Sequence, residues 1–370
     1  MSQADEDLQF MAAALAIGRR GLGLCAPNPS VGALIVKEGV ILGRGWTKPS
    51  GRPHAETEAL RDAGSAAQGA TLYVTLEPCS HHGQTPPCTD AIIAAGIARV
   101  VYAIDDPDPR ACGAGAKVLA DAAICVTKGV LAAGARMANL GHFLRVTSNR
   151  PMVTAKLALT ADNFAGGLAG EPRLVITGEP ANGFVHLMRA MHDAVMTGIG
   201  TMLTDDPLLT VRLQGLEVRR PLRVVVDSDL RLPPKARLAQ TAAKFPALVI
   251  AGEGANDARA AHLRKASVEV AHVRRDTAGR VDLKAALEML AARGLTRILC
   301  EGGPRLTAAL IGQGLADEVN ILTAPGPLGR AGVLGLDAES ASMLAGKQSY
   351  HLAGTRMIGA DRLTRYERAV

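Results

Sequence analysis

The chain has 370 residues, of which 48% are hydrophobic and 21% charged, a composition that excludes a disordered protein and suffices for more than one core. Aromatic residues make up only 3% of the chain, and the net charge of +6 comes from scattered Arg and Lys residues, so we expect no nucleic-acid partner. A phosphorylated small molecule suits this charge. No apolar run reaches the roughly 18 residues of a membrane span, so we expect no membrane partner either.

The first twenty residues predict a helix and not a leader peptide. They begin acidic and then place Leu8, Met11, Ala12 and Leu15 at helical spacing, unlike a basic segment followed by a continuous apolar run. In a long chain without such a leader, the six cysteines are expected to be reduced thiols. We therefore expect a cytoplasmic protein.

The first half of the chain alternates short β-like runs with Ala-rich helical stretches. The runs are VGALIV, TLYVTL, RVVYAI and AICVT, and the helices include AETEALRDAG and AGAKVLADAA. This alternation predicts a helix-covered α/β sheet. The pattern stops over residues 139–151, which predicts two domains, at 1–148 and 149–370.

The second half alternates in the same way and predicts a second α/β domain. The expected strands are VTAKLAL, DAVMTG, RVVVD, ALVIA, VEVAHV, RILC and VNILTA, and VDLKAALEMLAARG is an expected helix. No repeat or heptad period accompanies them, which argues against solenoids and coiled coils.

A set of candidate zinc ligands lies in PHAETEAL and LEPCSHHGQTPPC. His54, Cys79 and Cys88 are the imidazole and thiolate ligands that zinc favours, and a catalytic zinc has three protein ligands and one open position. Glu56, two residues after the histidine, is placed to act as general base and acid without binding the metal. This H-x-E pattern with two cysteines is typical of zinc deaminases. The residues predict hydrolytic deamination with one Zn²⁺ ion.

Two other interpretations of these residues stay open. His54 could be a surface histidine and the cysteines small core residues. Alternatively, His81 or His82 could supply a fourth ligand and make a closed structural zinc site.

Several longer motifs carry a resemblance that spans nearly the whole chain. They are APNPSVGALIV, PHAE, TLEPCSHHGQTPPC, DDPDP, TGIGTMLTDDPLLTVR and CEGGPRL. Together they resemble the bifunctional deaminase/reductase family of riboflavin biosynthesis. The long spacing between the two cysteines, which ends in TPPC, differs from the C-x-x-C of nucleoside and tRNA deaminases.

The resemblance implies a fold and two consecutive reactions. An N-terminal cytidine-deaminase-like three-layer α/β domain would deaminate 2,5-diamino-6-(5-phosphoribosylamino)pyrimidin-4-one, a phosphorylated pyrimidine. A C-terminal dihydrofolate-reductase-like α/β domain would use NADPH to reduce the ribosyl chain to ribityl. It further implies a homodimer formed through the reductase domain.

The resemblance also implies site residues. Those expected to contact substrate are Asn28, Arg173, Arg189, Leu209, Arg212 and Glu301. Those expected to contact NADPH are Ala158, Val175, Thr201, Asp205, Ser228, Gly303, Pro304, Arg305, Leu306, Thr307, Ala308 and Ala309. Elementary chemistry agrees with part of this set. Glycines at the start of a helix leave backbone N–H groups free to bind phosphate, and a guanidinium can donate two hydrogen bonds to a phosphate. Turn, cap or surface roles for these residues are the alternatives.

The chain departs from the family pattern at four positions. Asn163 stands where the family has Gly and Val175 where it has Trp; in the first half, Thr47 replaces His and Asp108 replaces Asn. The changes at Asn163 and Val175 motivate an alternative in which the second domain is a weakened or inactive reductase that serves as a dimerisation module. A nucleic-acid or nucleoside deaminase with an appended domain is a further alternative.

Overall fold

The computed structural model describes residues 2–109, 111–168, 170–172, 174–346 and 348–369. It divides into two compact units, Met1–Asn149 and Arg150–Val370. Each unit contains a sheet covered by helices, so the α/β fold class is confirmed.

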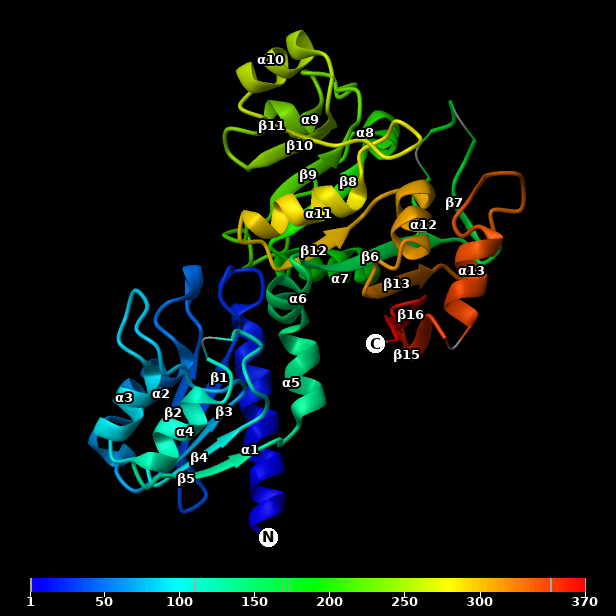
Figure 1. The fold of residues 1–370 in the computed structure, drawn as a ribbon. Coiled ribbons are helices and arrows are strands. Elements are labelled where there is room, and N and C mark those ends of the chain that lie inside the picture. The colour runs from blue at the N-terminus through cyan, green and yellow to red at the C-terminus, as the bar shows by residue number, and fades with distance from the viewer. Residues whose placement is uncertain (1, 110, 169, 173, 347, 370) are drawn as a thin grey trace. The chain divides into compact units, whose positions relative to one another are not determined.

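The first unit has a five-stranded sheet in the order β2-β1-β3-β4-β5 (Figure 1). Strand β1 is antiparallel to both of its neighbours, whereas β3, β4 and β5 run parallel. The strands are β1 (Gly32–Lys37), β2 (Val40–Trp46), β3 (Thr71–Val74), β4 (Arg99–Tyr102) and β5 (Cys125–Lys128). The helices are α1 (Gln3–Gly18), α2 (Ala55–Ala63), α3 (Cys88–Ala94), α4 (Ala114–Asp121), α5 (Ala132–Ala138) and α6 (Leu140–Ser148).

Alternation along β1 explains the layers of this unit. Leu34 and Val36 pack in a core with α1 and α5, while Ala33 and Ile35 pack in a second core with α2, α3 and α4. Successive side chains of a strand point to opposite faces, so one apolar strand serves both cores. The result is a three-layer arrangement, in which the expected first helix is α1.

Strand β2 was not among the expected strands, and its glycines explain how closely it packs against α2. A side chain at Gly43 or Gly45 would collide with the backbone of α2, at Ala59 and Ala55 respectively. The glycines let α2 lie directly against β2. The start of α2 carries His54 and Glu56, so this close packing fixes the metal ligand and the acid.

The second unit has a nine-stranded sheet in the order β11-β10-β9-β8-β12-β6-β13-β16-β15. Its strands are β6 (Met152–Leu159), β8 (Ala194–Gly198), β9 (Leu222–Val226), β10 (Ala247–Gly252), β11 (Glu269–Val273), β12 (Arg297–Cys300), β13 (Glu318–Thr323), β15 (Tyr350–Ile358) and β16 (Asp361–Arg368), and β7 (Phe164–Gly166) pairs with β14 (Val333–Leu334). The helices are α7 (Glu179–Ala190), α8 (Ile199–Asp205), α9 (Arg237–Gln240), α10 (Asp257–Lys265), α11 (Leu283–Ala292), α12 (Pro304–Gly312) and α13 (Ala338–Ala345).

Every strand expected in the second half is present, and these strands run parallel to their neighbours from β11 to β13. Strands β9, β8 and β12 are adjacent, so the segments that follow them reach the same edge of the sheet. In open α/β sheets this carboxyl edge is where ligands bind. The hairpin of β15 and β16 adds two antiparallel strands that the sequence analysis did not expect.

No helix of the described residues is both long and apolar enough to cross a bilayer.

Candidate active sites

The three expected metal ligands lie together in the first unit. His54 precedes α2, Cys88 opens α3, and Cys79 lies in the loop between β3 and α3. His54 Nδ1 lies 3.3 Å from Cys88 Sγ and 3.7 Å from Cys79 Sγ, and all three ligand atoms lie within 4.8 Å of one another. Tetrahedral zinc, with bonds of about 2.3 Å to sulfur and about 2.0 Å to nitrogen, places such atoms about 3.6 Å apart. The donor set fits zinc.

The group comprises three protein ligands. Among the described residues, neither His81 nor His82 belongs to it. A group of three protein ligands leaves one tetrahedral position for water or substrate, as catalytic zinc requires.

The pKa values of the two cysteines shift in opposite directions. Hydrogen bonds from Cys88 and His54 lower the pKa of Cys79 well below its usual range, and the Cys88 backbone N–H lies 3.3 Å from Cys79 Sγ. The pKa of Cys88 is raised because Cys79 holds the negative charge beside it and because it is buried. These contacts favour the thiolate form of Cys79, the form that binds a metal.

Glu56 lies in the first turn of α2 and is only 4% exposed. Burial raises its pKa, the charge of His54 lowers it, and Cys79 raises it again. A carboxyl group with a raised pKa beside the ligand cluster can both accept and return a proton.

Glu77 anchors the loop that carries Cys79. Its two carboxylate oxygens accept the backbone N–H groups of Gly113, at 2.9 Å, and Ala116, at 3.1 Å, at the start of α4. Glu77 is buried and lies two residues before Cys79, so the capping of α4 fixes the thiolate's backbone. Glu77 is not among the residues predicted from the sequence, although it belongs to the TLEPC motif.

Asn28 and Arg52 lie beside the metal ligands. Asn28 Nδ2 donates to Gly51 O at 3.0 Å and lies 3.5 Å from His54 Nε2, so the structure brings this expected substrate residue to the cluster. Arg52 Nη1 lies 3.4 Å from the same nitrogen and donates to Thr85 Oγ1 at 2.7 Å. Arg52 is not among the residues predicted from the sequence.

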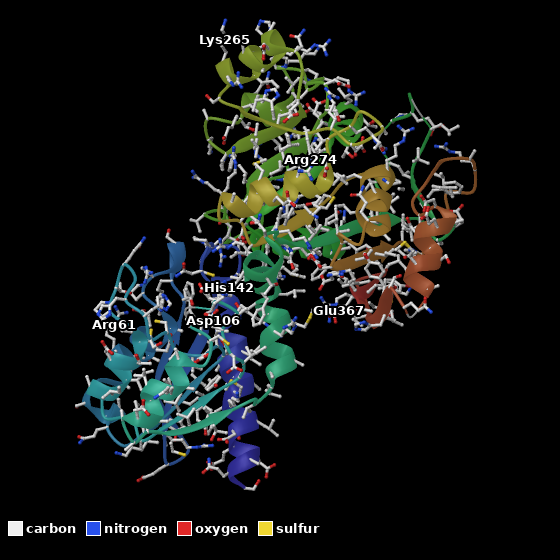
Figure 2. All side chains as sticks on the ribbon, in the orientation of Figure 1. Arg61, Asp106, His142, Lys265, Arg274 and Glu367 are labelled. Atoms are coloured by element: carbon white, nitrogen blue, oxygen red, sulfur yellow. The ribbon has the colours of Figure 1, made fainter. Side chains whose placement is uncertain are left out.

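Two of the altered positions have structural partners. Thr47 is buried, and its hydroxyl accepts the Val31 N–H at 3.0 Å, which supports the NPSVG segment. In the DDPDP motif, Asp106 Oδ1 accepts the Asp108 N–H at 2.9 Å and lies 3.2 Å from His142 Nε2 (Figure 2). These contacts tie the motif to α6.

In the second unit, Arg189 and Glu301 form a buried ion pair. Arg189 Nε and Nη2 donate to the two Glu301 carboxylate oxygens at 2.5 and 2.9 Å, and Nη1 donates to Thr210 O at 2.9 Å. Burial by itself raises the pKa of Glu301, but the charge of Arg189 outweighs it and brings that pKa to about 2. Both groups stay charged over the physiological range.

The segment after α8 supplies two further expected substrate residues. Leu209 is buried and has a left-handed φ of 54°, and it precedes Thr210, which accepts from Arg189. Arg212 is exposed, and its Nη1 donates to Thr210 Oγ1 at 3.1 Å. Four expected substrate residues thus gather around Thr210, whereas Arg173 lies outside the described residues.

The expected cofactor residues come mainly from the carboxyl edge of the sheet. Thr201 of α8 accepts the Gly303 N–H at 3.1 Å, and Gly303 caps α12. Ser228 follows β9, and its hydroxyl accepts the Val281 N–H at 3.0 Å. Asp205 ends α8.

Two other expected cofactor residues differ from each other in exposure. Ala158 is half-buried in β6, and Val175 is 76% exposed. Asn163 has a left-handed φ of 68°, and its amide donates to Leu336 O at 3.2 Å, so the turn keeps the conformation that glycine would adopt.

The first turns of α12 do not present all their expected residues on one face. Thr307 is fully buried, and Leu306 packs against Gly302. The remaining helix face turns toward α13, where an open pocket is lined by Arg280, Arg305, Ala308, Ala309, Gly312, Gln313, Asp337 and Glu339.

Comparison with known proteins places this geometry in a family. Residues 151–358 match the model of the RibD C-terminal domain, and residues 4–104 match the zinc-binding region of cytidine and deoxycytidylate deaminases. The riboflavin biosynthesis protein RibD of Aquifex aeolicus is 37% identical over 355 residues, which are 95% of this chain and 97% of the relative. The chain belongs to the RibD family.

Other RibD proteins extend the match. Escherichia coli RibD is 38% identical over 335 residues, covering 88% of this chain and 89% of the relative. A structure of Acinetobacter baumannii RibD covers 100% of both chains with a TM-score of 0.85 at 33% identity. The Thermotoga maritima diaminohydroxyphosphoribosylaminopyrimidine deaminase/5-amino-6-(5-phosphoribosylamino)uracil reductase does so with a TM-score of 0.84 at 32% identity.

This RibD-family chain is a bifunctional deaminase and reductase of riboflavin biosynthesis. Its first half is a zinc-binding, cytidine-deaminase-like domain and its second half a RibD reductase domain, so the expected fold class and the two enzyme activities are confirmed.

Proposed function

We propose that the first unit deaminates 2,5-diamino-6-(5-phosphoribosylamino)pyrimidin-4-one with one zinc ion held by His54, Cys79 and Cys88. The observation that carries this proposal is the convergence of these three ligands beside a buried carboxyl group, Glu56. The name of the Thermotoga maritima protein, a diaminohydroxyphosphoribosylaminopyrimidine deaminase, supports this substrate.

Each group of this site has a separate task. Zinc, when bound, activates water for attack on the amidine-like ring carbon. Glu56 accepts a proton from the attacking water and passes it to the ring nitrogen. It then takes the second proton from the hydroxyl group formed on the ring carbon and gives it to the departing amino group, which leaves as ammonia while the carbonyl forms. The amide of Asn28, held beside His54 by Gly51 O, can both donate to and accept from the ring edge.

The second unit, we further propose, reduces 5-amino-6-(5-phosphoribosylamino)uracil with NADPH, which supplies the hydride when bound. Thr201, Ser228 and Gly303 follow three neighbouring parallel strands and so share the ligand-binding edge of the sheet. The Thr201 hydroxyl fixes the Gly303 turn, and α12 begins there, which suits a dinucleotide phosphate.

The charged residues of this site divide between support and recognition. Arg189 is occupied by Glu301 and Thr210 O, so its guanidinium holds the site together. Arg212 carries an exposed cation next to them and suits the substrate phosphate.

One incubation tests both half-reactions. Purified protein with zinc and the diaminopyrimidine phosphate should release ammonia, and added NADPH should then lose absorbance at a comparable rate. Ammonia release without NADPH oxidation would support the alternative of an inactive reductase domain. Neither reaction, together with salt-sensitive RNA binding, would favour a nucleic-acid deaminase.

We also propose that two copies associate through the reductase domain at β15. This strand forms an edge of the nine-stranded sheet, most of its residues are exposed, and Leu352 and Met357 are 59% and 61% exposed. An exposed edge with apolar side chains favours pairing with another strand. Light scattering of the Met357→Arg variant should show monomers where the wild-type protein shows dimers, and an unchanged mass would contradict this interface.

A further inference from the structure

His186 has no role in the sites as described above, yet it contacts two of their arginines. It lies half-buried on α7, one helical turn before Arg189. The Arg212 backbone N–H donates to His186 Nδ1 at 3.1 Å, and Arg189 Nη1 lies 3.5 Å from the same nitrogen.

These neighbours determine which nitrogen carries the proton. A backbone N–H and a guanidinium can only donate hydrogen bonds, so Nδ1 must carry a lone pair. A neutral imidazole then holds its proton on Nε2. A doubly protonated ring would point an N–H at two donors and lose the bond to Arg212.

The surrounding charges favour the neutral ring. Arg189 faces His186 from the same helix, Arg212 from the segment after α8, and Glu301 from the end of β12. Burial and the two arginines lower the pKa of His186 to about 4, although Glu301 and a hydrogen bond to the Thr210 backbone act in the opposite direction. The ring is therefore neutral around pH 7.

The segment that His186 holds needs such support. Leu209 adopts a left-handed φ of 54°, which residues other than glycine rarely adopt. The contacts that tie this segment to α7 include Arg189 Nη1 to Thr210 O and the Arg212 N–H to His186 Nδ1.

We propose that His186 is a positioning residue of the reductase site: its neutral ring accepts the Arg212 N–H at Nδ1 and so fixes segment 206–212 for substrate binding. The proposal rests on the proposed reductase function. It assigns His186 no contact with reacting atoms.

Two substitutions in the full-length protein separate positioning from packing. His186→Leu removes the acceptor, whereas His186→Gln offers an amide oxygen to the same N–H. We expect His186→Leu to raise the KM for the deaminated intermediate about tenfold, the effect of one lost hydrogen bond, and His186→Gln to restore most of it. The KM for NADPH and the rate of ammonia release should stay unchanged in both variants.

The deaminase reaction of the same chain reports that each variant is folded and present in equal amount. His262→Gln, on the exposed face of α10, is a matched control that should alter no parameter. In wild-type protein labelled with ¹⁵N-histidine, the His186 signals should show an unprotonated Nδ1 and no titration between about pH 6 and about pH 8, where an ordinary histidine titrates.

Several results would overturn the proposal. One such result is an unchanged KM for the deaminated intermediate in His186→Leu; another is an equal increase of this KM in both variants. Either would show that the hydrogen bond from the Arg212 N–H to Nδ1 does not support substrate binding. If His186→Leu is misfolded, a protonated Nδ1 in the spectrum of the wild-type protein is sufficient to reject the proposal. Wild-type protein that oxidises no NADPH would instead refute the reductase proposal, and the tautomer measurement separates the two failures.

Discussion

Replacing Glu301 with Gln would leave the Arg189 guanidinium buried without its counter-charge. The pKa of Glu301 is about 2, against 4.5 for an ordinary glutamate, because the charge of Arg189 outweighs the effect of burial. The difference corresponds to about 3 kcal/mol of stabilisation at neutral pH, the lower end of the roughly 3 to 5 kcal/mol expected when a buried pair loses one partner. Amides of β12 and β6 should therefore exchange hydrogen roughly 150-fold faster in Glu301→Gln.

The effect of pH follows from the direction of the shift. Glu301 has a lowered pKa in the folded state, so its stabilisation is complete above the ordinary pKa of 4.5 and is lost as the pH falls toward 2. The difference in thermal midpoint between wild-type and Glu301→Gln should shrink from neutral pH to about pH 3. Asp121→Asn, which breaks the exposed Lys117–Asp121 pair, is the control and should cost less than about 1 kcal/mol. An exchange rate raised less than about fivefold, or a difference independent of pH, would refute this reasoning.

Three further substitutions test other parts of the structure. Glu77→Ala should lower the stability of the first unit by about 1 to 3 kcal/mol and weaken zinc retention, since it leaves two N–H groups of α4 without acceptors. A loss of stability with no change in zinc affinity would contradict the link between Glu77 and Cys79. Asn163→Ala should destabilise the second unit by about 1 kcal/mol or more, because alanine does not favour the left-handed φ of 68°, whereas Asn163→Gly should not. Equal thermal midpoints for the two variants would show that the turn is not strained. Thr201→Val should raise the KM for NADPH about tenfold in steady-state kinetics, because the Gly303 N–H loses its acceptor. An unchanged KM for NADPH would show that Thr201 does not support cofactor binding.

The strands that sequence patterns predict are those with continuous apolar runs. VGALIV, VTAKLAL and VNILTA are buried on both faces, so their composition alone identifies them. Strand β2 escapes because Gly43 and Gly45, required by the backbone of α2, interrupt its pattern. Strands β15 and β16 escape because His351, Gly354, Thr355 and Arg356 interrupt the apolar residues of β15 and charged residues dominate β16.

The metal site is predictable because its ligands and its acid stand in short motifs. The residues that support it are not, since their partners are distant in the sequence. Glu77 acquires its role from N–H groups at the start of α4, and His186 from the backbone of Arg212. Only the folded chain brings such donors and acceptors together, so residue type alone does not reveal them.

The central claim is that His54, Cys79 and Cys88 hold a catalytic zinc at which Glu56 moves protons. The most direct test is ammonia release by Glu56→Gln, measured on protein with its zinc content determined. The account predicts one zinc per chain, no ammonia release, and undiminished NADPH oxidation when the deaminated intermediate is supplied. Ammonia release at the wild-type rate from this zinc-loaded variant would contradict it.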